Sequence, residues 1–158
     1  MKPMTKNREL KELKDAVLLY VPLSQHIGSP SIPLVEIGDY VKKYEKIGEI
    51  SGNISANIHS PVSGDVVDVV EHFIANGNKV KTIIIANDFK NKEENLVKRE
   101  LRDLKLIKKD EIFKIIKEAG IVGLGGAQFP THIKYDIKFR KVETFIICLL
   151  YTSPSPRD

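Results

Sequence analysis

The stretch GIVGLGGAQFPTHIKY, residues 120–135, holds groups that could bind a phosphate-bearing ligand. The residues concerned are three glycines, an aromatic ring and a cation: Gly123, Gly125, Gly126, Phe129 and Lys134. Glycines let the backbone approach a ligand closely, the ring can stack on a base, and the ammonium can pair with a phosphate. This combination suits a nucleotide or a flavin phosphate. A tight irregular turn is the alternative explanation for the same glycines.

The spacing matches neither of two common glycine motifs of nucleotide-binding proteins. Lys134 does not fit the P-loop pattern G-x-x-x-x-G-K-[ST], and no strand is predicted before the glycines, as a dinucleotide-binding fingerprint requires. A helix is predicted there instead, because four apolar residues recur at i, i+3, i+4 and i+7: Ile112, Ile115, Ile116 and Ala119. Asp110 is expected to cap this helix and Gly120 to end it, so the glycine stretch is expected to be a loop.

Residues 16–90 have the pattern of a small β-rich domain. Short apolar runs, AVLLYVPL, IPLVEI, DVVDVV and KTIIIA, are separated by Gly, Pro, Asn and Asp. Such spacing is typical of a barrel or a sandwich. The region shows no catalytic constellation of its own. The mixed charges of residues 91–109 predict a solvated connector after it.

The β-rich region resembles a lipoyl or biotinyl carrier domain, whose half-repeat reads roughly V-x-x-G-D-x-V, then an acidic residue, a hairpin and S-P-x-x-G. The matching residues are Val35, Gly38, Asp39, Val41, Glu49, Ser60, Pro61 and Gly64. Carrier domains present a lysine at the hairpin tip. Here the tip falls at Gly52-Asn53, which is expected to form a two-residue turn and offers no amine. The resemblance implies a barrel retained for shape and docking, without covalent carriage.

Composition excludes several classes of function. Lys and Arg outnumber Asp and Glu by 25 to 21, but the charges are interspersed, which argues against nucleic-acid binding. No apolar stretch suggests a transmembrane helix or a signal peptide, so a cytoplasmic chain is expected. The four histidines share no metal-ligand spacing, so no metal site is expected: His26, His59, His72 and His132. His26 and His59 are expected to satisfy loop backbone groups, and His132 borders the ligand loop.

The final residues, CLLYTSPSPRD at 148–158, resemble the translation of a transposase sequencing adapter. They are therefore set aside from the fold, together with Cys148, the single cysteine. The natural chain is expected to continue past Ile147. Without its neighbours, the strand expected at VETFII would leave an unpaired apolar edge, so aggregation or disorder of that segment is predicted.

Three motifs occur in the same order as in the C subunit of the Rnf ion-translocating electron-transport complex. They are VPLSQHIGSP at 21–30, IHSPVSGDV at 58–66 and AGIVGLGGAQFPTHIK at 119–134. A similar glycine loop occurs in the NADH-binding flavoprotein of respiratory complex I, where it helps to hold FMN and the nicotinamide nucleotide. Gln128 and His132 stand where the complex I pattern has glycine.

The resemblance implies how the loop would act. The three glycines would line FMN or NADH, Phe129 would lie beside the adenine, and Lys134 would reach a phosphate. It also implies a protein peripheral on the inner face of a bacterial cell membrane, with membrane subunits as partners and ferredoxin or a similar redox protein as an indirect one. FMN would accept hydride from NADH, and electrons would pass to 4Fe-4S clusters in the missing C-terminal part.

The expected fold class is mixed α and β, a lipoyl/biotinyl-like barrel-sandwich domain followed by the truncated start of an α/β FMN/NADH-binding domain. The expected segments are an N-terminal tail, the barrel, a charged connector, the domain start and the adapter-like tail: 1–15, 16–90, 91–109, 110–147 and 148–158. The fragment is expected to be inactive by itself. A non-catalytic docking or scaffold module is the alternative, because the carrier-like barrel lacks its lysine.

We predict that the reading frame continues beyond Ile147 into an N-G-x-E-C-E-P segment and, further on, cysteine clusters. Amplifying unfragmented source DNA across codon 147 and sequencing onward checks this. A frame that ends in CLLYTSPSPRD would contradict the electron-transfer interpretation and leave only the docking module.

Overall fold

The computed structural model describes most of the chain between residues 14 and 137. The described residues are 9, 12, 14–97, 100, 106–124, 127–137 and 142–144. The chain divides into two compact units, of which one is Asp15–Asp136 and the other combines Met1–Lys14 with Ile137–Asp158. The second unit has few described residues, and none of these lies in a helix or strand. The predicted strand at 142–147 and the adapter-like tail fall wholly or partly outside the described residues.

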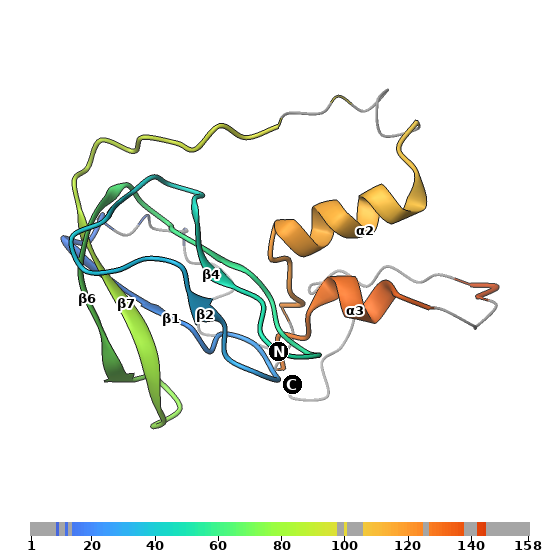
Figure 1. Cartoon of the computed structure of the whole chain (residues 1–158), viewed down its shortest axis with the longest axis horizontal. Coiled ribbons are helices and arrows are strands. Elements are labelled where there is room, and N and C mark those ends of the chain that lie inside the picture. The colour runs from blue at the N-terminus through green and yellow to red at the C-terminus, as the bar shows by residue number, and fades with distance from the viewer. Residues whose placement is uncertain are drawn as a thin grey trace. The chain divides into compact units, whose positions relative to one another are not determined.

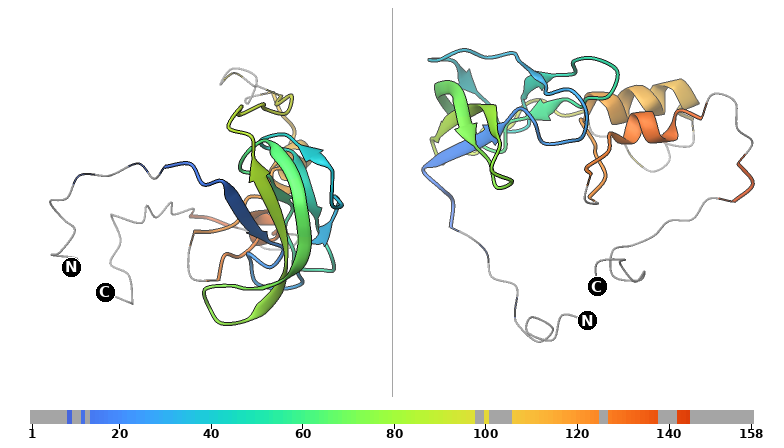
Figure 2. Two further views of the ribbon diagram at one scale, coloured as in Figure 1. Left: turned by 90° about the vertical axis from the view of Figure 1, so that its left-hand side faces the viewer. Right: turned by 90° about the horizontal axis from the view of Figure 1, so that it is seen from below.

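The larger sheet of the Asp15–Asp136 unit is antiparallel, with strand order β1-β7-β6-β3. Its strands are β1 (Leu18–Pro22), β3 (Tyr40–Val41), β6 (Gly64–Phe73) and β7 (Lys79–Asn87). The two long strands β6 and β7 form a hairpin and curve together (Figures 1 and 2). Apolar residues alternate along β6, so Val66 is buried while Val67 is 44% exposed.

A smaller antiparallel sheet, in the order β2-β4-β5, completes the barrel. Its strands are β2 (Ile32–Pro33), β4 (Lys46–Glu49) and β5 (Ile58–His59). Aliphatic side chains of both sheets and of the loops between their strands form one core: Val21, Leu23, Val35, Val41, Ile47, Ile58, Val66, Ile83 and Ile85. Two sheets around a shared core confirm the predicted barrel-sandwich class.

The loop between β4 and β5 differs from the prediction. Gly52-Asn53 does not form a two-residue hairpin turn, because β4 ends at Glu49 and β5 begins only at Ile58. The longer loop is folded onto the segment before β2, where Ser29 N–H donates to the Ile54 carbonyl at 2.8 Å. These distant hydrogen bonds outweigh the local turn preference of a Gly-Asn pair.

Two helices follow the barrel, α2 (Lys109–Glu118) and α3 (Thr131–Tyr135), coloured orange in Figure 1. The predicted cap at Asp110 is wrong: the N-cap is Lys108, and no side chain caps the helix. Asp110 lies in the first turn, where a carboxylate favours the positive end of the helix dipole. Gly120 ends the helix region with φ +63°, as predicted. None of the helices in the described part of the chain combines the length and apolarity that a membrane crossing requires.

The predicted connector begins beside the barrel, and six of its residues 91–97 are exposed. Lys43 N–H donates to the Lys92 carbonyl, and Glu94 N–H donates to the Lys43 carbonyl. The Lys42 ammonium lies 3.1 Å from the Glu94 carboxylate. These backbone bonds make the start of the connector an edge segment beside β3.

Candidate functional site

The glycine stretch after α2 is a narrow hairpin. Gly123 N–H donates to the Phe129 carbonyl at 2.9 Å, and Thr131 N–H donates to the Ile121 carbonyl at 2.9 Å. Val122 and Pro130 form an antiparallel bridge between these two bonds. The chain then enters α3 directly. The described residues on either side of positions 125–126 therefore close into a hairpin.

The structure places three of the five predicted ligand residues. Gly123 and Phe129 face each other at the base of the hairpin, and Lys134 lies exposed on α3. Gly125 and Gly126 lie outside the described residues. Within the described part of the chain, the Lys134 ammonium makes no ion pair.

These placements fit a phosphate-bearing cofactor in part. The Gly123 N–H already bonds to Phe129, so it serves the hairpin and is not free to donate to a phosphate. Leu124 is 90% exposed, and the exposed Lys134 can supply a cation. Among the predicted ligand residues that the structure describes, Lys134 is thus the one that fits a phosphate.

Gln128 occupies a backbone conformation that favours glycine. Its φ is +46°, which an L-residue other than glycine or asparagine adopts at a cost of roughly 1–2 kcal/mol. The complex I pattern has glycine here, so the backbone geometry agrees with that pattern while the side chain differs. Gln128 lines an open cavity of about 370 Å³ together with Tyr20 and Gln25 of the barrel.

A larger cavity, of about 800 Å³, opens between α2 and the barrel in the described part of the chain. Its walls include Tyr44, Leu96 and Ile115, and none of the predicted ligand residues lines it. It is a weaker candidate for the predicted nucleotide site because Gly123, Phe129 and Lys134 do not line it. The described residues also contain no cluster of three or more potential metal ligands.

The barrel domain identifies the family. Residues 1–90 match the family described as the RnfC barrel sandwich hybrid domain. The chain belongs to the RnfC family. The match covers the strands of both sheets, so the carrier-like barrel is the RnfC barrel.

Curated relatives extend the likeness past the RnfC barrel. The chain is 38% identical over 140 residues to the C subunit of a proton-translocating ferredoxin:NAD(+) oxidoreductase complex of Clostridium ljungdahlii, with 88% of this chain and 30% of the relative covered. For the Na(+)-translocating counterpart of Acetobacterium woodii, the identity is 39% over 124 residues, covering 78% and 28%. The C subunit of an ion-translocating oxidoreductase complex of Rhodobacter capsulatus is 37% identical over 149 residues, covering 92% and 28%. The chain spans less than a third of the length of these relatives.

One histidine of the RnfC barrel bonds to backbone groups, as predicted, and a second lies close to the end of α2. The His26 ring is 9% exposed and accepts a hydrogen bond from Ala56 N–H at 3.1 Å. Burial lowers the pKa of His59, and the Glu118 backbone at the end of α2 partly opposes this effect. His132 on α3 has a buried Nδ1 that has no hydrogen-bond partner among the described residues. Burial, and secondarily the Lys117 ammonium, lowers the pKa of His132.

Sequence reasoning missed the residues that hold the hairpin against the RnfC barrel. Ile27 N–H donates to the Ala127 carbonyl at the hairpin tip at 3.1 Å. Asn57 donates to the last carbonyls of α2, just before the hairpin. An asparagine in a turn-rich stretch gives no local signal of such a distant partner. Only the missing carrier lysine marked this loop as unusual.

We predict that Gly120→Ala destabilises the chain more than Gly77→Ala. Both glycines have positive φ, +63° and +83°, so alanine costs roughly 1 kcal/mol at either site. A Cβ on Gly120 would also overlap the Asn57 carbonyl oxygen, whereas nothing lies within 4 Å of one on Gly77. The additional loss at Gly120 should be about 1–3 kcal/mol, measured by urea unfolding followed by circular dichroism. Equal losses would contradict the close packing of the helix end on the barrel.

We also predict that the chain loses stability between pH 7 and pH 5, partly through His59. Burial lowers the pKa of His59 below its usual 6.5, and the nearby Lys46 ammonium adds to this effect. His59 therefore binds a proton more readily in the unfolded chain than in the folded chain. The contribution of His59 to the free energy of unfolding is fully present above pH 6.5 and declines as the pH falls toward the lower folded-state pKa. The free energy of urea unfolding in His59→Gln should depend less on pH than in the unsubstituted chain. His72→Gln, at an exposed histidine, is the control; an unaltered slope in His59→Gln would refute the assignment.

Proposed function

We propose that this chain is the N-terminal part of the C subunit of an ion-translocating ferredoxin:NAD(+) oxidoreductase complex. We further propose that its glycine hairpin contributes to an FMN- and NADH-binding site. The observation that supports this most is a glycine hairpin with an accessible tip and an exposed lysine, held beside an RnfC barrel. The names of the relatives supply the reaction class.

Two described residues of the proposed site, Lys134 and Phe129, have binding roles. Lys134 pairs with a phosphate of the cofactor or of the nucleotide, as an exposed ammonium without a competing described carboxylate can do. Phe129 contacts a base through its ring. Bound FMN supplies hydride acceptance and single-electron transfer. The chain's own residues bind and orient these groups.

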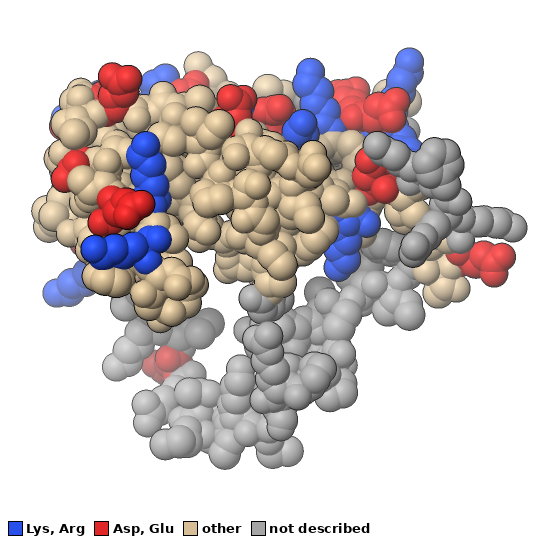
Figure 3. Space-filling view, turned by 60° about the horizontal axis from the view of Figure 1, so that its bottom comes forward, with Lys and Arg blue, Asp and Glu red and all other residues tan. Residues whose placement is uncertain are grey.

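The setting of the proposed function follows from the same relatives. Their names describe translocating complexes, so we place the chain with other subunits of a membrane complex, peripheral on the inner face of the cell membrane. Ferredoxin or a similar redox protein is the indirect partner, and 4Fe-4S clusters belong to the longer polypeptide. On the face shown in Figure 3, acidic and basic side chains lie next to one another rather than in separate patches. Recognition of such partners would then depend on shape more than on long-range charge.

The domain boundaries remain part of this proposal. The barrel over 16–90 supplies the scaffold, and the segment from residue 110 onward starts the nucleotide-binding part. Lys134 lies on α3, outside the barrel, so a substitution there should leave the stability of the barrel unaltered. Its proposed role in binding can therefore be tested by a single substitution.

We predict that Lys134→Ala, in the full-length protein purified within its complex, lowers FMN or NADH affinity by roughly ten- to a hundredfold. The reason is the loss of a charge-assisted bond to phosphate. FMN content by absorbance and steady-state NADH oxidation measure the effect. Lys81→Ala, at an exposed lysine of β7, is the matched control. If Lys134→Ala leaves both quantities unchanged, the nucleotide role fails and a docking or scaffold role for the chain takes its place.

A further inference from the structure

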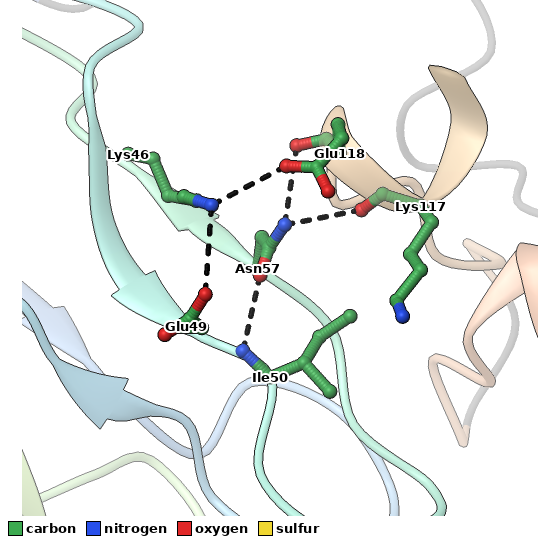
Figure 4. A network of polar contacts seen from close by, with 6 residues as sticks. All are labelled: Lys46, Glu49, Ile50, Asn57, Lys117 and Glu118. Carbon is green, nitrogen blue, oxygen red and sulfur yellow. Dashed lines mark hydrogen bonds and ion pairs between the residues drawn. The ribbon is translucent and has the colours of Figure 1, made fainter. Parts of the chain in front are cut away.

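The C-terminal end of α2 faces a set of hydrogen-bond donors on the barrel. Asn57 Nδ2 lies 3.3 Å from the Lys117 carbonyl oxygen and 3.4 Å from that of Glu118. Lys46 Nζ donates to the Glu118 carboxylate at 3.3 Å, as Figure 4 shows. The His59 ring lies beside the end of α2, close to Gly120. We call Lys46, Asn57 and His59 the donor cluster.

The donor cluster is complementary to a helix C-terminus. The last carbonyls of a helix lack partners within the helix, and the helix dipole places partial negative charge there. Three of the last carbonyls of α2 accept from the chain just after them, since Ala119 N–H donates to Ile115, Ile121 N–H to Ile116 and Gly120 N–H to Lys117. The Glu118 carbonyl receives its donor, Asn57 Nδ2, from the barrel instead. The barrel thus caps a helix that begins far along the chain.

Asn57 is the most rigidly held member of the donor cluster. It is 5% exposed, and its Oδ1 accepts a hydrogen bond from Ile50 N–H at 3.0 Å. With its oxygen engaged inside the β4–β5 loop, the amide can only direct Nδ2 toward α2. Gly120 packs so closely on the Asn57 carbonyl that a side chain would not fit. The amide therefore determines where the hairpin leaves the helix.

The hairpin is tied to the barrel at a second point. Ile27 N–H donates to Ala127 near the tip, and the adjacent His26 ring accepts from Ala56 N–H, one residue before Asn57. One tether comes from Asn57 in the β4–β5 loop, and the other comes from Ile27 in the loop after β1. The hydrogen bond between Ala56 N–H and His26 joins these two loops. A change at Asn57 would move the start of the hairpin relative to its tip.

We propose that Asn57 is a positioning residue for the nucleotide-binding hairpin. The β4–β5 loop, where carrier domains hold a lysine for a swinging arm, here fixes the glycine hairpin of the same chain for a phosphate-bearing nucleotide. This inference rests on the proposed function. Loss of the Asn57 donor weakens nucleotide binding through misplacement of the hairpin and leaves the chemistry after binding unaltered.

The test compares Asn57→Asp with Asn87→Asp. Aspartate keeps the shape of asparagine and an acceptor for Ile50 N–H, but it removes the donor to α2. Asn87 is a close control, because it is 9% exposed, accepts from Phe89 N–H and donates to the Ala16 carbonyl, away from α2. Asn57→Gln retains an amide donor and should have a smaller effect than Asn57→Asp.

Two measurements are made. In the 158-residue chain, amide hydrogen exchange at residues 119–122 should be about tenfold faster in Asn57→Asp and unaltered in Asn87→Asp. Protection of Ile83–Ile85 amides should stay the same, which shows that the barrel still folds. In the full-length protein within its complex, the KM for NADH should rise about tenfold in Asn57→Asp, with kcat within about twofold.

The outcomes separate the inference from the function on which it rests. Equal exchange in Asn57→Asp and Asn87→Asp overturns the capping role of Asn57. Faster exchange with an unaltered KM overturns the positioning role. If Asn57→Asp loses the exchange protection of the barrel amides, the comparison moves to Asn57→Gln. Unaltered exchange and an unaltered KM in Asn57→Gln would then indicate a purely structural asparagine and overturn the proposal. Failure of Lys134→Ala to affect FMN or NADH would remove the proposed function, while hydrogen exchange would still decide whether the barrel caps α2.

Discussion

The end of α2 needs hydrogen-bond donors, and the barrel supplies them. The last carbonyls of a helix lack partners within the helix, and a folded neighbour can supply donors at fixed positions. Asn57 donates to the Lys117 and Glu118 carbonyls, and the Lys46 ammonium beside it pairs with the Glu118 carboxylate. The direction of the glycine hairpin follows from this contact, because Gly120 turns the chain immediately afterwards. The two bonds from Asn57 are long, so the buried and pre-oriented amide matters more than the strength of either bond.

The barrel can present these donors because its core is complete without the helices. Side chains from both sheets and their connecting loops bury one another, and residues such as Ile47, Ile83 and Ile85 are fully buried. By contrast, α2 has no buried residue, and its apolar residue Ile112 is 43% exposed. Polar contacts therefore carry much of the attachment that apolar burial provides within the barrel. Such attachment is more sensitive to the loss of a single side chain than a broad apolar interface would be.

An architecture related to carrier domains acquires a different use in this arrangement. A carrier needs an exposed, mobile tip with an amine, whereas the corresponding loop here folds back onto Ser29 and bonds to a helix. A loop held at both sides cannot swing. The RnfC barrel is then best understood as a support for the hairpin rather than as the carrier of a tethered arm. Lys134 on α3 is exposed.

The sequence by itself determined the elements and much of the family-level interpretation. Alternating apolar residues and turn residues predicted the β-rich region, helical spacing predicted α2, and Gly120 marked its end, because these signals act between residues a few positions apart. Local signals failed at Asp110, which lies in the first turn of α2 two residues after the N-cap. They also failed at Gly52-Asn53, where hydrogen bonds from Ser29 N–H to Ile54 and from Ile50 N–H to Asn57 outweighed the local turn preference. The tertiary structure alone decided which groups meet the end of α2. Asn57 and Lys117 are 60 residues apart along the chain, so no local propensity could pair them, and only the packing of the helix on the barrel brings them together.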